Sequence, residues 1–172
     1  YKKDYPEWSD RGDGPGAPVA IHLPNSAVIA TGKRDGSKIR LPNGNYLEET
    51  ASYYVMIETK TGGYTPALIT MKSTQLNVSK KWNSMMKTIQ IPDGKGGFAI
   101  PPMHGVVYNL ASTLQKNDKG SWYGWVVTQD RILGQEDKAL YLSAKDFSGN
   151  VSKGTVQTKA DVEEKVSDST PY

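Results

Sequence analysis

Lysines without acidic neighbours form the first group of residues that could bind a ligand. Between residues 59 and 92 the chain carries five lysines and no Asp or Glu, so this segment should hold a local positive potential. We expect lysines in it, with Arg131 as a weaker candidate, to contact phosphates of a nucleic acid; these are Lys72, Lys80, Lys81 and Lys87. The alternative is that these lysines only form the water-exposed face of a helix and bind no ligand.

Aromatic residues beside lysines form the second group. Tyr64 follows a pair of glycines, and Tyr123 and Trp125 lie in a segment that begins just after Lys116 and Lys119. Single-stranded nucleic acids are held by rings that stack on bases, at about 1–3 kcal/mol per base, and by cations that follow the backbone. These residues are therefore candidate nucleic-acid contacts, although aromatic side chains also pack in cores.

No group of residues matches a catalytic or metal-binding pattern. The chain has no cysteine, which excludes disulfides, thiolate zinc sites and cysteine nucleophiles. His22 and His104 are far apart in the sequence and no motif places carboxylates beside them. Neither a phosphate-binding loop nor a nucleophile elbow occurs. We expect a protein that is not an enzyme and uses no metal or other cofactor.

The charge of the chain is unevenly distributed. The formal net charge is +3, yet residues 159–172 carry two lysines against four acidic residues. An acidic end with few apolar residues is typical of a solvated tail, so we expect residues 151–172 to be flexible. The tail either has no role, competes with an anionic ligand, or recruits partner proteins. No apolar stretch approaches the roughly 18 residues of a membrane span, so we expect a soluble, intracellular protein without a membrane partner.

One helix is predicted strongly, over residues 73–89. Its apolar residues recur at the spacing of a single helical face, and its lysines fall on the other side; the apolar set is Val78, Trp82, Met85, Met86 and Ile89. A hydroxyl of Ser73 or Thr74 could cap its first turn. The apolar face favours a core position for Trp82.

Turn residues predict three β-hairpins around this helix. Asn43-Gly44 follows a strand at residues 38–41, glycines at 62 and 63 separate strands at 51–58 and 64–71, and a polar turn at 116–120 separates strands at 104–113 and 121–128. Further expected segments are a loop over 1–17, strands over 17–22 and 26–31, a flexible loop over 91–97 and a helix over 136–147.

This order of elements predicts a mainly β (α+β) fold. Five antiparallel strands with one helix between the third and fourth strands fit a barrel of the oligonucleotide-binding (OB) type, followed by a C-terminal helix. We therefore expect a flexible segment over residues 1–17, an OB-like barrel domain over 18–150 and the acidic tail over 151–172.

Several segments resemble a family of tailed-bacteriophage proteins labelled as single-stranded DNA-binding. The resemblance covers about residues 38–130 and rests on LPNGN at 41–45, ETASYYV at 49–55, ALITMKSTQL at 67–76, SKKWNSMM at 79–86 and KNDKGSWY at 116–123. It implies a role in phage DNA replication or recombination in the cytoplasm of the infected bacterium. Phage replication proteins would then be the partners of the acidic tail.

Two functions from different classes follow. The first is sequence-independent binding and protection of single-stranded DNA. The second is a phage structural module, or one that binds a host enzyme, using the same barrel for protein contacts. A hydrolase or nuclease is a third possibility that no grouping of acids, bases or metal ligands supports.

Overall fold

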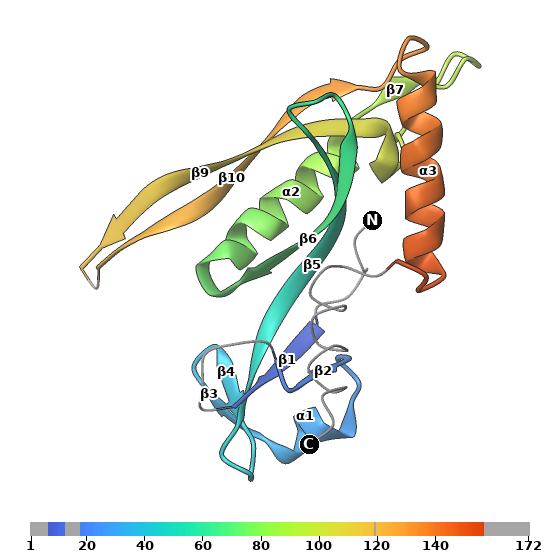
Figure 1. Ribbon diagram of the computed structural model, residues 1–172. Helices are drawn as coiled ribbons and strands as arrows, with labels where there is room; N and C mark the ends of the chain where they lie inside the picture. The colour runs from blue at the N-terminus through green and yellow to red at the C-terminus, as the bar shows by residue number, and fades with distance from the viewer. Residues whose placement is uncertain (1–6, 13–17, 119, 157–172) are drawn as a thin grey trace, which may run out of the picture.

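The computed structural model describes residues 7–12, 18–118 and 120–156, and within them the protein is mainly β, as expected, with three α-helices where two were predicted. Its largest sheet is antiparallel, with strands in the order β2-β1-β5-β4-β3 and β6 paired with β5. The long strand β5 runs from the lower part of the molecule to the upper part (Figure 1). The strands are β1 (Glu7–Arg11), β2 (Ala20–His22), β3 (Lys33–Asp35), β4 (Lys38–Arg40), β5 (Tyr46–Glu58) and β6 (Tyr64–Lys72).

The lower part of the molecule is built on β1 to β4 and the first half of β5. Its first core cluster consists of Trp8, Ile39, Leu41 and Leu47, with α1 (Ala27–Thr31) packed against it. The predicted strand over 26–31 is wrong, because Ser26 caps a short helix by accepting a hydrogen bond from the Val28 backbone N–H. Val28 and Ile29 of the helix pack against the first core cluster.

Strand β1 corrects the expectation of a loop over residues 1–17. Glu7–Arg11 pairs with both β2 and β5, and Glu7, Trp8, Ser9 and Asp10 are buried. Glycine and proline nearby predicted a loop, but pairing with distant β5 decides the conformation of these five residues. Residues 1–6 and 13–17 lie outside the described part of the chain.

The predicted hairpins around residues 43–44 and 62–63 are confirmed. Gly44 (φ +92°) and Gly62 (φ +81°) take the left-handed conformation that their turns require. After β6 the chain forms a short 3-10 turn, η1 (Ser73–Gln75), and then α2 (Leu76–Thr88). No side chain caps η1 or α2, so the predicted hydroxyl cap is wrong.

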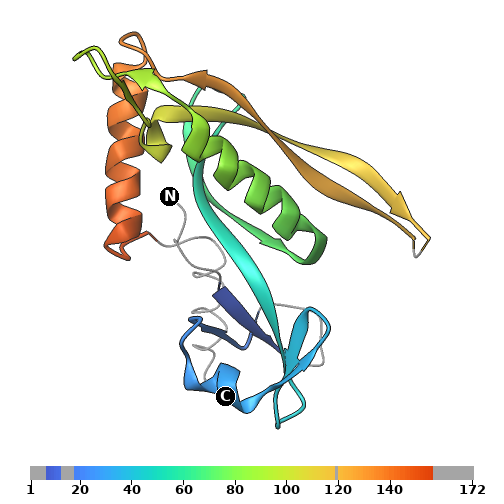
Figure 2. The ribbon, with the colours of Figure 1, turned by 180° about the vertical axis from the view of Figure 1, so that it is seen from behind.

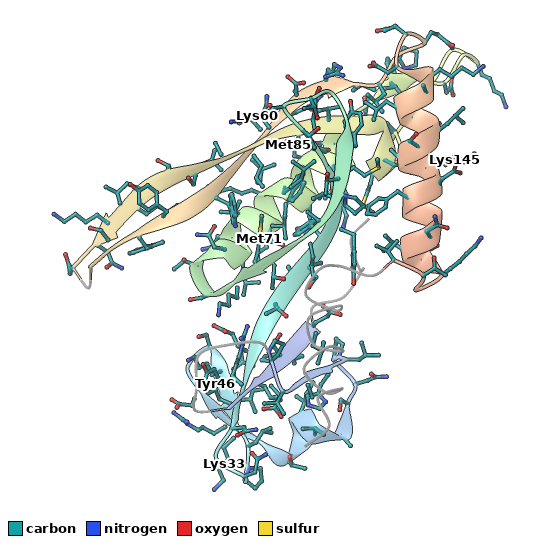
Figure 3. All side chains as sticks on the ribbon, in the orientation of Figure 1. Lys33, Tyr46, Lys60, Met71, Met85 and Lys145 are labelled. Atoms are coloured by element: carbon teal, nitrogen blue, oxygen red, sulfur yellow. The ribbon has the colours of Figure 1, made fainter. Side chains whose placement is uncertain are left out.

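The second core cluster lies between the β5–β6 hairpin and α2. It contains Ala51, Tyr53, Met71 and Trp82, with Tyr108 and Val127 among the residues packed on it. Figure 3 shows Met71 of β6 beside α2. The predicted core position of Trp82 is confirmed, since only 6% of this residue is exposed.

Strands β9 (Val106–Asn117) and β10 (Gly120–Ile132) form the third predicted hairpin, hereafter the arm. Its tip projects beyond α2, whereas α3 (Lys138–Ser152) stands at the other end of the upper part (Figures 1 and 2). Helix α3 runs past its predicted end, and Val151 is buried. None of the described helices is long and apolar enough to cross a membrane.

The segment over 91–97, expected to be a flexible loop, contains part of a small hairpin of β7 (Ile91–Pro92) and β8 (Phe98–Ala99). The carboxylate of Asp93 accepts hydrogen bonds from the backbone N–H groups of Lys95 (2.8 Å) and Gly97 (2.9 Å), which hold its turn. These bonds lower the pKa of Asp93.

The backbone ladders of the described strands form three separate sheets. The arm and the β7–β8 hairpin each form a two-stranded sheet beside the six-stranded one. The second core cluster joins the arm to the large sheet through side chains. The described strands therefore pack together without a closed hydrogen-bonded barrel.

Candidate functional site

The upper part of the described structure contains a cavity of about 620 Å³, partly open to solvent. Its walls come from β5, β6, α2, the arm and α3, which contribute mainly aromatic and aliphatic side chains. Among the described lining residues, the charged ones are Glu58, Asp130 and Arg131, and none is a lysine. The cavity suits a flat apolar group better than a phosphate.

Two of the three predicted aromatic contacts line this cavity. Tyr64 of β6 and Trp125 of β10 both contribute to its wall, with exposed fractions of 38% and 37%. Tyr123 is 73% exposed and lies farther out on the arm, opposite Leu114. The fold therefore brings Tyr64 and Trp125 to one hollow and leaves Tyr123 on a projecting surface.

Trp82 lines the cavity as part of an aromatic stack. Its ring stacks on Tyr53 at 4.3 Å between centroids and meets the edge of Tyr108 at 5.5 Å. The hydroxyl of Tyr53 hydrogen-bonds to Oγ of buried Ser79 at 2.7 Å and donates to Oδ1 of Asn83 at 3.3 Å. Burial raises the pKa of Tyr53, and these two bonds partly offset the effect.

Tyr108 contrasts with Tyr53 on the other side of Trp82. Its hydroxyl is buried and has no hydrogen-bond partner among the described residues. Burial raises the pKa of Tyr108 to about 12. The indole Nε1 of Trp82 is also buried without a described partner. The hydroxyl of Tyr53 is therefore hydrogen-bonded, whereas the hydroxyl of Tyr108 has no described hydrogen-bond partner.

Two predicted cationic contacts are paired with acidic side chains. Nζ of Lys72 lies 3.5 Å from Glu48, and the guanidinium of Arg131 lies 3.2 Å from Asp130 and 3.3 Å from Asp137. The Gly134 backbone N–H and Arg131 together lower the pKa of Asp137, so this carboxylate stays charged. Lys72 and Arg131 are thus the least available of the predicted phosphate contacts.

Three other lysines form a stripe on α2. Lys80, Lys81 and Lys87 are exposed on the side away from Trp82, and none makes an ion pair with a described residue. Lys87 also borders a smaller hollow next to Met86, which lines the main cavity. We call Lys80, Lys81 and Lys87 the α2 stripe.

The side chain of Gln75 connects the beginning of α2 to the arm. Its Oε1 accepts a hydrogen bond from the Trp125 backbone N–H at 3.0 Å. Because an α-helix rises 1.5 Å per residue, Lys80 and Lys81 lie roughly 8–9 Å along the axis from this junction. Lys116 is exposed on the arm, and Lys119 lies outside the described residues.

Two further features were missed by the sequence analysis. The hairpin of β3 and β4 concentrates Lys33, Arg34, Lys38 and Arg40 at the lower edge of the large sheet. Its signal was the turn dipeptide Asp35-Gly36 between two charged extended runs. The cavity itself also had no local signal, because its walls come from segments up to 95 residues apart, from Tyr53 to Ser148.

The histidines do not form a metal site in the described structure. Nε2 of His22 lies 3.8 Å from Oδ2 of Asp10, and His104 packs at 5.2 Å from the ring of Tyr141. No group of three or more potential metal ligands occurs among the described residues. Burial, followed by the charge of Lys145, lowers the pKa of His104.

Comparison with known proteins identifies one protein family. A family model described as "Pam3 phage gp34-like protein" matches residues 1–157. No curated protein and no solved structure matches the chain. The description refers to a phage and states no activity.

Proposed function

The chain belongs to the Pam3 phage gp34-like family, and from that premise we propose that it binds single-stranded DNA without sequence preference and protects it during phage replication or recombination. Bases would enter the cavity between Tyr64 and Trp125, and phosphates would pass over the α2 stripe. The protein acts as a binding protein rather than an enzyme, in the cytoplasm of the infected bacterium.

One observation carries the proposal. Tyr64 and Trp125 are 61 positions apart in the sequence, yet both partly exposed rings line the same open cavity. A base with an apolar face can stack there, and stacking depends little on base identity. Glu58 and Asp130 at the lining repel phosphates, so the backbone of the strand would stay outside the cavity.

The α2 stripe supplies the electrostatic part of this proposal. Its lysines lack described ion-pair partners, so a phosphate would not have to displace a carboxylate from them. The sequence around them has no acidic residue from 59 to 92. Lys116 and Tyr123 on the arm would extend the contact to neighbouring nucleotides.

The relation to an OB barrel belongs to the same proposal. The order of the strands and the position of α2 between β6 and β9 support it. Because the strands form separate sheets, side-chain packing rather than backbone hydrogen bonds would close the barrel on its ligand-binding side.

Quenching of tryptophan fluorescence by oligo-dT tests the proposal directly. Binding at low salt should weaken with increasing salt, and emission that oligo-dT leaves unchanged at low salt would reject it. Trp125→Leu should weaken binding roughly 5- to 150-fold, the equivalent of about 1–3 kcal/mol for one stacked base.

Variants of the α2 stripe test the electrostatic contribution to DNA binding separately from the stacking contribution. Lys80→Gln with Lys81→Gln should reduce the slope of log affinity against log salt by roughly 1.4, because each single-strand phosphate contact contributes about 0.7. Lys138→Gln with Lys145→Gln on α3 removes the same charge and should leave the slope unchanged. Equal effects of the two pairs would show that only net charge matters.

Protein contact is a second candidate function, as a phage structural module or a binder of a host enzyme. The observation that favours it is exposed apolar surface that bases do not require, with Leu114 61% exposed on the arm and Phe98 71% exposed on β8. This function predicts a stable complex or self-association and no salt-dependent DNA binding. Light scattering of the purified chain, beside the oligo-dT titration, distinguishes the two.

A further inference from the structure

A second basic surface lies at the opposite end of β5 from the cavity. The β3–β4 hairpin carries four cations and one carboxylate within residues 33–40. Lys33, Arg34 and Arg40 are exposed, and β3 is an edge strand of the large sheet. Figure 3 shows Lys33 at the lower end of the molecule, below Tyr46.

The pairing of the hairpin places like charges together. Lys33 lies directly opposite Arg40, and cross-strand pairs of the same charge destabilise a sheet. Asp35 offsets this only in part, since its carboxylate lies 3.6 Å from Arg40 and both side chains are largely exposed. Lys33 and Arg34 make no ion pair with a described residue. An anion bound here would relieve the repulsion.

The fold holds these cations on a rigid support. Ile39, between Lys38 and Arg40, is buried in the first core cluster, and Nζ of Lys38 lies 3.9 Å from the centre of the Tyr46 ring. A Cβ atom at Gly32 would lie 2.3 Å from Cγ2 of Ile39, so only glycine lets the end of α1 approach β4 this closely. The charged edge is therefore fixed relative to β5.

Strand β5 also sets the distance between the two surfaces. Residue 47 pairs with β4, and residue 57 lines the cavity. At about 3.3 Å per residue, the ten intervening steps span roughly 33 Å. A stacked strand carries one phosphate per about 3.4 Å, so roughly ten nucleotides would cover this distance.

We propose that the β3–β4 hairpin is a second phosphate-binding surface, which engages the backbone of a single-stranded nucleic acid whose bases occupy the cavity. This inference rests on the proposed function and assigns the ligand class of a hairpin outside the primary site. Lys33 and Arg34, which no described carboxylate pairs with, contact phosphates, and only strands long enough to reach from the cavity use them.

The length of the oligonucleotide provides the test. The full chain and its Lys33→Gln/Arg34→Gln variant are titrated with oligo-dT of about 5 and about 20 nucleotides at several salt concentrations. The variant should bind the short oligonucleotide like the wild type. For the long oligonucleotide, the slope of log affinity against log salt should be smaller for the variant by roughly 1.4. Between about 50 and 200 mM salt, the factor by which affinity falls should then be about seven times larger for the wild type than for the variant. Lys138→Gln/Lys145→Gln is the charge-matched control.

Each other outcome contradicts the inference in a recognisable way. If the wild type binds the long oligonucleotide and the variant shows the same affinity and slope, the hairpin does not contact the strand, while the proposed function stands. If the variant loses affinity for both lengths equally, the hairpin is no separate surface. If the wild type binds neither oligonucleotide, the proposed function and this inference fail together.

Discussion

Removing one hydroxyl from either tyrosine beside Trp82 should have opposite effects on stability. In Tyr53→Phe, buried Ser79 loses its 2.7 Å hydrogen bond, and an unsatisfied buried group costs about 1–3 kcal/mol. In Tyr108→Phe, the hydroxyl removed has no described partner, so the variant should be about 1 kcal/mol more stable than the wild type. Both variants keep the aromatic rings.

Urea unfolding of the two variants measures this difference. A loss of about 2 kcal/mol in Tyr53→Phe corresponds to a Tm lowered by about 4–8 °C for a chain of this size. The slope of free energy against urea should not change, because neither variant alters the surface exposed on unfolding.

A double-mutant cycle with Ser79→Ala completes the experiment. The Tyr53 and Ser79 substitutions should couple by about 0.5–1.5 kcal/mol, since each removes the same bond. Tyr108→Phe with Ser79→Ala should be additive. The reasoning is refuted if Tyr53→Phe and Tyr108→Phe change stability equally, or if the first pair shows no coupling.

Three further predictions concern other parts of the fold. Gly32→Ala should lower the free energy of unfolding by about 1–3 kcal/mol, measured by urea unfolding, because its methyl group overlaps Ile39; Gly36→Ala, with open space around its Cβ but a positive φ, is the comparison. Gln75→Ala should accelerate hydrogen exchange of the Trp125 amide by roughly 5- to 10-fold, and an unchanged rate contradicts the bond. The folded-state pKa of His104 lies below its ordinary value of 6.5, so the stability of the protein should be highest above pH 6.5 and should fall as the pH drops from 6.5 toward the folded-state pKa. In His104→Gln, Tm should depend less steeply on pH in this range. An equally steep dependence in the variant contradicts the prediction.

Local patterns predicted α2 and two of the hairpin turns. The apolar spacing from Val78 to Ile89 gave α2, and Asn43-Gly44 and Gly62-Gly63 gave their turns, because helical periodicity and left-handed turns depend on residues close in the chain. Strand β1 depends on β5, about 40 residues away, so no local pattern revealed it. Helix α1 was missed because its β-branched residues also suit a strand.

The candidate site was predictable in its residue types more than in its geometry. Tyr64 and Trp125 were found from their aromatic character, but the sequence could not show that both line one cavity. Partners of the cations were equally hidden: Glu48 reaches Lys72 because β5 and β6 pair, and Asp137 reaches Arg131 across a turn. Availability of a charge depends on such tertiary neighbours.

Strand β5 also makes the two core clusters depend on a single alignment. Leu47 serves the first cluster, and Ala51 and Tyr53 serve the second, all from alternate positions on one side of the same strand. A slip of β5 by one residue would turn all three side chains outward at once. Misalignment of this strand would therefore disrupt both core clusters at once, so the stability of the lower and the upper part depends on the same pairing of β5.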